Sequence, residues 1–220
     1  LKSWNAFNEL HDDPLLRLDK WLFFGHSPAV LLHDLLGQHV AEFVLPALYQ
    51  SFTQMVPVSL VAALVLAHRI RDGYVFLMSA MWVWILGVGS YYLIPTLGPF
   101  ASAPQDFSHL PHTEITSTQA KYMAERAHLL QHPAAGDAFA SIAAFASLHI
   151  GFTFMVVLML RYYGFRRATQ AMSVYLAAVI IATIYLGWHY VVDDIAGLAL
   201  AYFAVLFGRL MIYPPGRRSP

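Results

Sequence analysis

The stretch Leu186-Gly187-Trp188-His189-Tyr190-Val191-Val192-Asp193-Asp194-Ile195-Ala196-Gly197 places one histidine and two carboxylates between two long apolar runs. No other acidic residue follows Asp137. On a helix, His189 and Asp193 would share one face. The carboxylate could then accept a hydrogen bond from one ring nitrogen, leaving the other nitrogen to attack an electrophile or bind a metal. The alternative is a histidine at the membrane interface beside a solvated aspartate pair, and we interpret Asp194 as a solvated or capping neighbour.

The composition indicates an integral membrane protein. Of the 220 residues, 58% are hydrophobic and 12% are charged, and the mean hydropathy is +0.54. Soluble domains carry about twice that share of charge. The net charge of zero gives no basis for nucleic-acid binding, and the absence of cysteine excludes disulfides and thiolate metal sites. The sequence begins with Leu1 instead of methionine, so we expect it to be trimmed, and its first residues do not resemble a cleavable signal peptide.

The hydrophobic pattern predicts an all-α fold, a polytopic membrane bundle of five to six transmembrane helices with amphipathic helices before it. Residues 1–39 mix charged and apolar side chains, which is typical of helices at the membrane interface. Residues 40–213 form the predicted membrane domain, and residues 214–220 form a cytoplasmic tail. The five spans, each near the ~20 residues that a bilayer requires, are expected at about 40–66, 74–94, 138–160, 168–188 and 191–211.

The basic residues predict how the spans are oriented. The linkers 67–73 and 161–167 and the C-terminal end carry eight of the thirteen lysines and arginines, whereas the polar loop 95–137 carries two. The positive-inside rule places the linkers in the cytoplasm and the loop outside. His189 then lies on the outer side, so we expect an extracytoplasmic active site, in the plasma membrane.

The polar loop 95–137 holds a stretch, Thr118–Leu130, with the pattern of an amphipathic helix. It also holds four histidines without regular metal-ligand spacing, which we interpret as surface residues: His109, His112, His128 and His132.

A second motif, Ala146-Ser147-Leu148-His149, lies in the third expected span. An ionisable residue at that depth is costly and is a functional candidate by default. If the helix begins late, near Ser147, its hydroxyl and first amides form an anion-binding helix start. In either case, we expect the His149 side chain to face the outer side of the membrane. Two histidines facing one pocket, one of them backed by a carboxylate, suit a general acid and a nucleophile.

These motifs resemble the signatures of the type 2 phosphatidic acid phosphatase superfamily. Ser147-Leu148-His149 and the run from Tyr185 to Asp193 are more similar to the branch of inositol phosphorylceramide synthases and related bacterial proteins, which has Ser-Leu-His where the phosphatases have Ser-Gly-His. The segment Tyr92–Phe100 resembles the first motif of this branch, and the resemblance covers roughly residues 74–211.

The resemblance implies a mechanism without metal or cofactor, since the nucleophile is a neutral imidazole. His189 attacks phosphorus and becomes a phosphohistidine, while Asp193 orients and charges it. His149 protonates the leaving alcohol and then activates the acceptor, and Ser147 binds a phosphate oxygen.

The chain departs from the phosphatase pattern at its basic positions. Residues 74–100 contain no lysine or arginine, and Thr183 stands where the pattern has an arginine before the nucleophilic histidine. Another cation has to neutralise the phosphate, and the outer side offers Lys121 and Arg126 beyond the N-terminal segment. We favour Arg126. These departures weigh against simple phosphatidic acid phosphatase activity.

The predicted function is that of a membrane lipid phosphatase acting on a lipid phosphate or phospholipid at the outer leaflet. Transfer of a polar head group, such as inositol phosphate, onto a lipid or glycan alcohol is the second hypothesis, because the same intermediate serves both acceptors. A channel or proton-coupled transporter with His149 and Asp193 as a relay is a third, although the sequence lacks the internal repeats typical of transporters. The fourth hypothesis is a metal-dependent hydrolase with His149, His189 and Asp193 as ligands. Loss of activity on adding a chelator would distinguish it from the other three.

Overall fold

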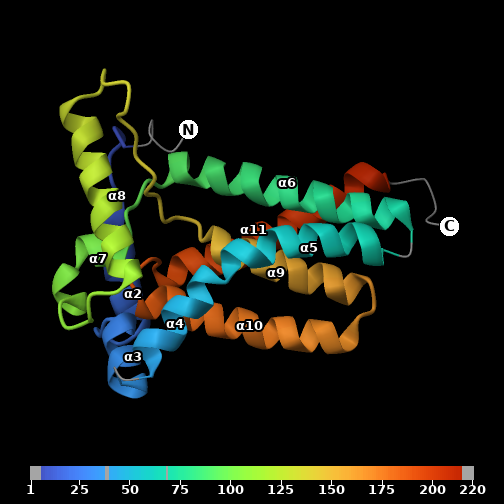
Figure 1. The fold of residues 1–220 in the computed structure, drawn as a ribbon, viewed down its shortest axis with the longest axis horizontal. Coiled ribbons are helices and arrows are strands. Elements are labelled where there is room, and N and C mark those ends of the chain that lie inside the picture. Colours follow the sequence, from blue (N-terminus) through green and yellow to red (C-terminus); the bar gives the residue numbers. More distant parts are fainter. Residues whose placement is uncertain (1–5, 38–39, 68, 215–220) are drawn as a thin grey trace. The chain divides into compact units, whose positions relative to one another are not determined.

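The computed structural model describes residues 6–37, 40–67 and 69–214, and within these ranges all regular structure is helical (Figure 1). The N-terminal helices expected from the sequence are confirmed, and they are α2 (Asp12–Leu22) and α3 (Pro28–Leu36). The helix expected in the polar loop is confirmed as α8 (Glu114–Gln131). The predicted C-terminal tail lies outside the described residues, apart from Pro214.

The apolar runs form helices of the length that a bilayer requires, so the chain is an integral membrane protein. In the part of the chain that the structure describes, four helical segments could cross a membrane by length and composition. They are residues 41–66, built from α4 (Ala41–Gln50) and α5 (Phe52–Leu66), then α6 (Ile70–Leu93), α10 (Arg166–Tyr185) and α11 (Val191–Ile212). A shorter apolar helix, α9 (Leu148–Tyr162), stands where the third span was expected.

The prediction for the third span is wrong in its first half. We expected a helix from about residue 138, but α9 begins only at Leu148. The backbone before it bonds to Thr96 instead, because the Ala144 amide donates to the Thr96 carbonyl at 3.0 Å and the Phe145 amide donates to the Thr96 hydroxyl at 2.9 Å. The alternative of a late helix start is therefore confirmed.

The described helices belong to two compact units that interleave along the sequence. Unit 1 comprises residues 1–47, 88–145 and 181–193, and unit 2 comprises residues 48–87, 146–180 and 194–220. In unit 1, α2 packs against the short helix α7 (Pro99–Ser102), and α3 packs against the 3₁₀ helix η1 (Pro104–Phe107). In unit 2, α5 packs against α9.

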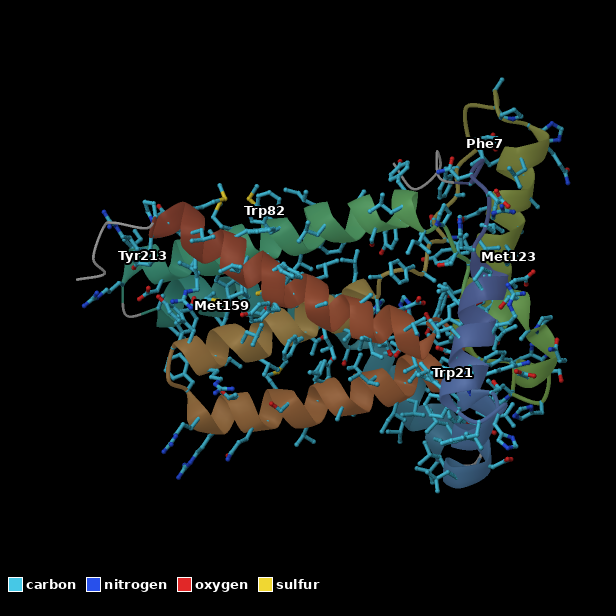
Figure 2. The ribbon with its side chains drawn as sticks, turned by 180° about the vertical axis from the view of Figure 1, so that it is seen from behind. Phe7, Trp21, Trp82, Met123, Met159 and Tyr213 are labelled. Atoms are coloured by element: carbon cyan, nitrogen blue, oxygen red, sulfur yellow. The ribbon has the colours of Figure 1, made fainter. Side chains whose placement is uncertain are left out.

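Unit 2 is held by helices that run side by side (Figure 1). Ile150 and Val157 of α9 form a buried cluster with Leu176 and Val179 of α10. At the arginine-rich end of the unit, the Asp72 carboxylate accepts hydrogen bonds from the hydroxyls of Tyr162 at 3.0 Å and Tyr213 at 3.1 Å. Tyr213 is labelled in Figure 2. These contacts fix α9, which carries one of the two histidines of interest.

Helix α11 approaches the first turn of α9 through a glycine. A methyl group at Gly197 would lie 2.5 Å from the Ser147 carbonyl oxygen and 3.2 Å from the Gly151 amide nitrogen. Both neighbours are backbone atoms, so they cannot rotate aside. The position of Ser147 and His149 in unit 2 therefore depends on the absence of a side chain at Gly197.

We expect Gly197→Ala to destabilise the protein. Overpacking typically costs about 1–3 kcal/mol, which outweighs the ~1 kcal/mol that alanine gains over glycine in a helix. The matched control is Gly89→Ala in α6, where a methyl group would meet nothing within 4 Å. Thermal unfolding in detergent should give a lower midpoint for Gly197→Ala than for Gly89→Ala, and an equal or higher midpoint would contradict this packing.

Candidate active site

The loop that carries His189 begins where α10 ends in a Schellman motif. The Trp188 amide donates to the Thr183 carbonyl at 3.0 Å, and the Gly187 amide donates to the Ile184 carbonyl at 3.1 Å. Gly187 has φ +73°, the left-handed conformation that glycine adopts without strain. Thr183, which stands in place of the arginine of the family pattern, thus supplies a carbonyl to the turn before His189.

The segment that resembles the first motif of the family lies against this loop. The Phe100 amide donates to the Gly187 carbonyl at 3.0 Å. Gly98 has φ +104°, and a methyl group there would lie 2.6 Å from the Trp188 carbonyl oxygen. Two of the motifs found in the sequence are therefore brought together by backbone contacts at glycine positions.

His189 and Asp193 come together as predicted, but not on one helical face. Helix α11 begins at Val191, so His189 stands in the loop before it. Asp193 Oδ2 accepts a hydrogen bond from the Tyr190 amide at 2.9 Å and lies 3.5 Å from His189 Nδ1. The side chains of His189 and Asp193 are 7% and 0% exposed. The carboxylate thus caps the start of α11 and also faces one ring nitrogen of the histidine.

Two further carboxylates, both from α2, bind the same region of unit 1. Asp19 accepts hydrogen bonds from the Val191 amide at 2.8 Å and the Val192 amide at 3.3 Å. Burial raises the pKa of Asp19, and these two amides oppose that rise.

Asp12 joins the first-motif segment to Tyr190. Its carboxylate accepts from the amides of Leu97, at 3.0 Å, and Gly98, at 2.9 Å, and from the Tyr190 hydroxyl at 2.9 Å. Burial and the Asp12 charge raise the pKa of Tyr190, so its hydroxyl stays protonated and donates. The Ser102 hydroxyl, 2.6 Å away, therefore donates to the Tyr190 oxygen.

Side chains of α3 and α8 hold the carbonyls at the end of α10. His33 Nε2 donates to the Tyr185 carbonyl at 2.8 Å, and Gln119 donates to the Leu186 carbonyl at 2.8 Å. The rings of Tyr185 and His109 pack edge-on against the His33 ring. Burial lowers the pKa of His33 below its ordinary value of 6.5. The hydrogen bond through Nε2 and the lowered pKa both indicate a neutral ring with the proton on Nε2.

Ser147 and His149 belong to unit 2. Ser147 is fully buried and is the N-cap of α9, where its hydroxyl accepts from the Ile150 amide at 3.5 Å. The His149 ring stacks on Tyr49 at a centroid distance of 4.3 Å and lies 4.2 Å from the Phe52 ring centroid. Two aromatic rings thus fix the orientation of the His149 imidazole.

The predicted phosphate-binding cations make other contacts in unit 1. Arg126 donates to the Ala6 carbonyl at 3.2 Å, and its Nε is buried without a hydrogen-bond partner among the described residues. Lys121 lies 3.9 Å from Glu125, with its side chain 72% exposed. Their part in phosphate binding stays a prediction.

The structure also tests the interpretations of Asp194 and of the histidines in the polar loop. Asp194 was interpreted as a solvated or capping neighbour. It is 3% exposed, so the solvated alternative is wrong, and the capping alternative stays a prediction. All four histidines of the polar loop are exposed, as expected: His109, His112, His128 and His132. In the described part of the chain, no group of three or more histidine and acidic side chains is placed to hold a metal ion.

Sequence reasoning missed Asp12, Asp19, His33 and Gln119, all of which are buried. Asp12 and Asp19 had a signal, because their spacing puts two carboxylates on one face of an amphipathic helix. His33 and Gln119 had none, since their partners are backbone carbonyls far away in the sequence.

The apolar helices and the buried His189–Asp193 pair define an integral membrane protein with a candidate histidine-centred site. A family model described as the PAP2 superfamily matches residues 13–207, so the chain belongs to the PAP2 superfamily, that of the type 2 phosphatidic acid phosphatases. This membership supports an enzyme of the phosphatase or phosphotransferase type that acts on lipid phosphates. No curated protein and no solved structure gives a significant match.

We expect acid to destabilise the protein through His33. Because its pKa is lower in the folded state, the stability it contributes is present above about pH 6.5 and is lost as the pH falls below that value. Glutamine at this position keeps a nitrogen that can donate to the Tyr185 carbonyl but does not titrate. The unfolding midpoint should therefore fall less between about pH 7 and about pH 5 in His33→Gln than in the wild type.

The control for this comparison is His112→Gln, at an exposed position. It should keep the pH dependence of the wild type. Equal pH dependence in the wild type and His33→Gln would show that the buried histidine does not carry the effect.

Proposed function

We propose that the protein hydrolyses a lipid phosphate at the outer leaflet through a phosphohistidine on His189. The observation that carries the proposal is the placement of Asp193 Oδ2 at 3.5 Å from His189 Nδ1, in a loop fixed by hydrogen bonds on both sides. Catalytic hydrogen bonds are often long before substrate binds and shorten in the complex. Asp193 then holds the proton on Nδ1, and Nε2 is the nucleophile.

In the proposed first step, His189 Nε2 attacks phosphorus and the bond from phosphorus to the lipid oxygen breaks. The leaving oxygen takes a proton from His149, and the Asp193 carboxylate stabilises the positive charge that develops on the His189 ring. In the second step His149 takes a proton from water, the water oxygen attacks phosphorus and the phosphorus–nitrogen bond breaks. Phosphate leaves and both histidines return to their starting states.

The proposed phosphate ligands are Ser147, Arg126 and Lys121, in keeping with the family resemblance and the predicted topology. Helix α9 is long enough for the positive end of its dipole to favour an anion near Ser147. The Ser147 hydroxyl now accepts from the Ile150 amide, and its own proton can still be donated to a phosphate oxygen.

Transfer of a phosphoryl head group to an alcohol is the second candidate. Two sequence features favour it, the Ser147-Leu148-His149 motif of the phosphotransferase branch and Thr183 in place of the arginine. An alcohol would then replace water in the second step, with the same two histidines.

His189→Ala should abolish turnover while the protein stays folded, because it removes the nucleophile. We expect a loss of at least ~10³-fold in kcat with short-chain phosphatidic acid in mixed micelles. His149→Ala should lose about 10²–10⁴-fold, the usual contribution of a general acid, and His112→Ala should retain wild-type activity. The assay follows released phosphate, and in parallel the transfer of labelled head group from phosphatidylinositol to a lipid alcohol.

Phosphate release identifies hydrolysis, and labelled transfer product identifies the second candidate. Wild-type activity in His189→Ala would refute both mechanisms. A loss of activity on adding a chelator, restored by a divalent cation, would favour the metal-dependent alternative.

The outer-leaflet location has its own test. The chain contains no cysteine, so single cysteines can be introduced without background. Because the arginine-rich linkers favour the cytoplasm, Ser108→Cys should react with a membrane-impermeant maleimide in intact cells, and Ser219→Cys should react only after permeabilisation. The reverse pattern would place the proposed site on the cytoplasmic side.

A further inference from the structure

We propose that Asp12 and Asp19 of α2 are positioning residues for His189, an inference that rests on the proposed function of that histidine. The two aspartates are two helical turns apart and lie on one face of α2. They are 7% and 3% exposed, whereas Asp13 between them is exposed. Buried carboxylates are costly unless they are hydrogen-bonded. Their burial therefore indicates that this face of α2 serves to bind the groups that the two carboxylates contact.

The partners of the two aspartates are the residues that follow His189 directly. Asp19 binds the amides of Val191 and Val192, and Asp12 binds the hydroxyl of Tyr190. These are three consecutive residues, starting with the neighbour of the nucleophile. A displacement of this backbone moves the imidazole relative to any phosphorus atom it must attack.

Asp19 supplies hydrogen-bond acceptors to backbone amides at the start of α11. The first amides of a helix have no partner within the helix. The described contacts divide them between two carboxylates, since Asp193 takes the Tyr190 amide and Asp19 takes the next two. Without Asp19, Asp193 would be the one side chain left to hold the start of the helix among the described contacts, and Asp193 also has to face His189.

Asp12 also holds the segment that contacts the loop before His189. It binds the amides of Leu97 and Gly98 with the same carboxylate that accepts from Tyr190. The Leu97–Gly98 segment contacts the loop before His189, because Gly98 lies against the Trp188 carbonyl. Helix α2 therefore connects the backbone on both sides of the nucleophile.

The exposed side of α2 carries large apolar side chains beside the charged Asp13 and Arg17, a mixture that suits a helix lying at the membrane interface. Leu18, Trp21 and Leu22 are 41%, 75% and 39% exposed, and Trp21 is labelled in Figure 2. One helix thus presents carboxylates to the loop and apolar side chains to its surroundings.

The test compares Asp19→Asn and Asp12→Asn with Asp13→Asn, a matched change at the exposed position between them. In single-turnover experiments with excess enzyme, we expect Asp19→Asn to lower the rate constant of phosphohistidine formation about 10- to 100-fold, the scale of a misplaced reacting group. The KM should change less than kcat, Asp13→Asn should match the wild type, and Asp19→Glu should restore part of the rate. A merely structural role would reduce the fraction of active enzyme but would leave this rate constant unchanged.

The substrate is short-chain phosphatidic acid, or phosphatidylinositol if the preceding assay shows transfer. Wild-type rate constants in both Asp19→Asn and Asp12→Asn, beside an inactive His189→Ala, would overturn the inference alone. A wild-type enzyme that forms no phosphohistidine would instead overturn the proposed function.

Hydrogen exchange gives a readout that does not depend on activity. We expect Asp19→Asn to speed exchange of the amides of residues 188–192, because the asparagine NH2 group replaces one of the two oxygens that accept from Val191 and Val192, while α9 keeps its protection. Asp13→Asn should leave both regions unchanged. Unchanged exchange at residues 188–192 in Asp19→Asn would overturn the inference whatever the enzyme does.

Discussion

Buried carboxylates that bind backbone amides are the interaction on which the candidate site depends. Asp193 and Asp19 satisfy the first amides of α11, and Asp12 satisfies the amides of Leu97 and Gly98. For the buried amides of Leu97, Gly98 and Tyr190, the loss of this partner would cost about 1–3 kcal/mol each. The geometry of His189 follows from this arrangement, because the histidine stands between the Schellman turn of α10 and the capped start of α11.

This arrangement also bears on where a phosphate can bind. Helix starts commonly hold anions, but the described amides at the start of α11 already bind protein carboxylates. Asp12 likewise accepts from the Tyr190 hydroxyl and from the amides of Leu97 and Gly98, so these donors are also taken. The phosphate ligands that we propose, Ser147 at the start of α9 with Arg126 and Lys121, belong to other elements.

The sequence was sufficient to predict the features that depend on local pattern. The apolar runs predicted the membrane helices, and the spacing of His189 and Asp193 predicted their pairing. The third span was misjudged because residues 138–147 are apolar enough for a helix, and hydrophobicity does not reveal that their amides bond to Thr96, far away in the sequence. The spacing of Asp12 and Asp19 places them on one helical face, but it does not name the amides that they bind. The contribution of His33 was not predictable, since a buried polar side chain in an amphipathic segment looks like a solvated one until its partner is known.

The central claim is that His189 carries the phosphoryl group, and mapping the intermediate tests it most directly. The enzyme would be quenched in alkali during turnover of a lipid phosphate labelled at phosphorus, digested at neutral or alkaline pH and sequenced by mass spectrometry. The account predicts a base-stable, acid-labile phosphoryl group on the peptide that contains His189, and none in His189→Ala. A label on serine or aspartate, or turnover with no covalent label under conditions that preserve phosphohistidine, would contradict it.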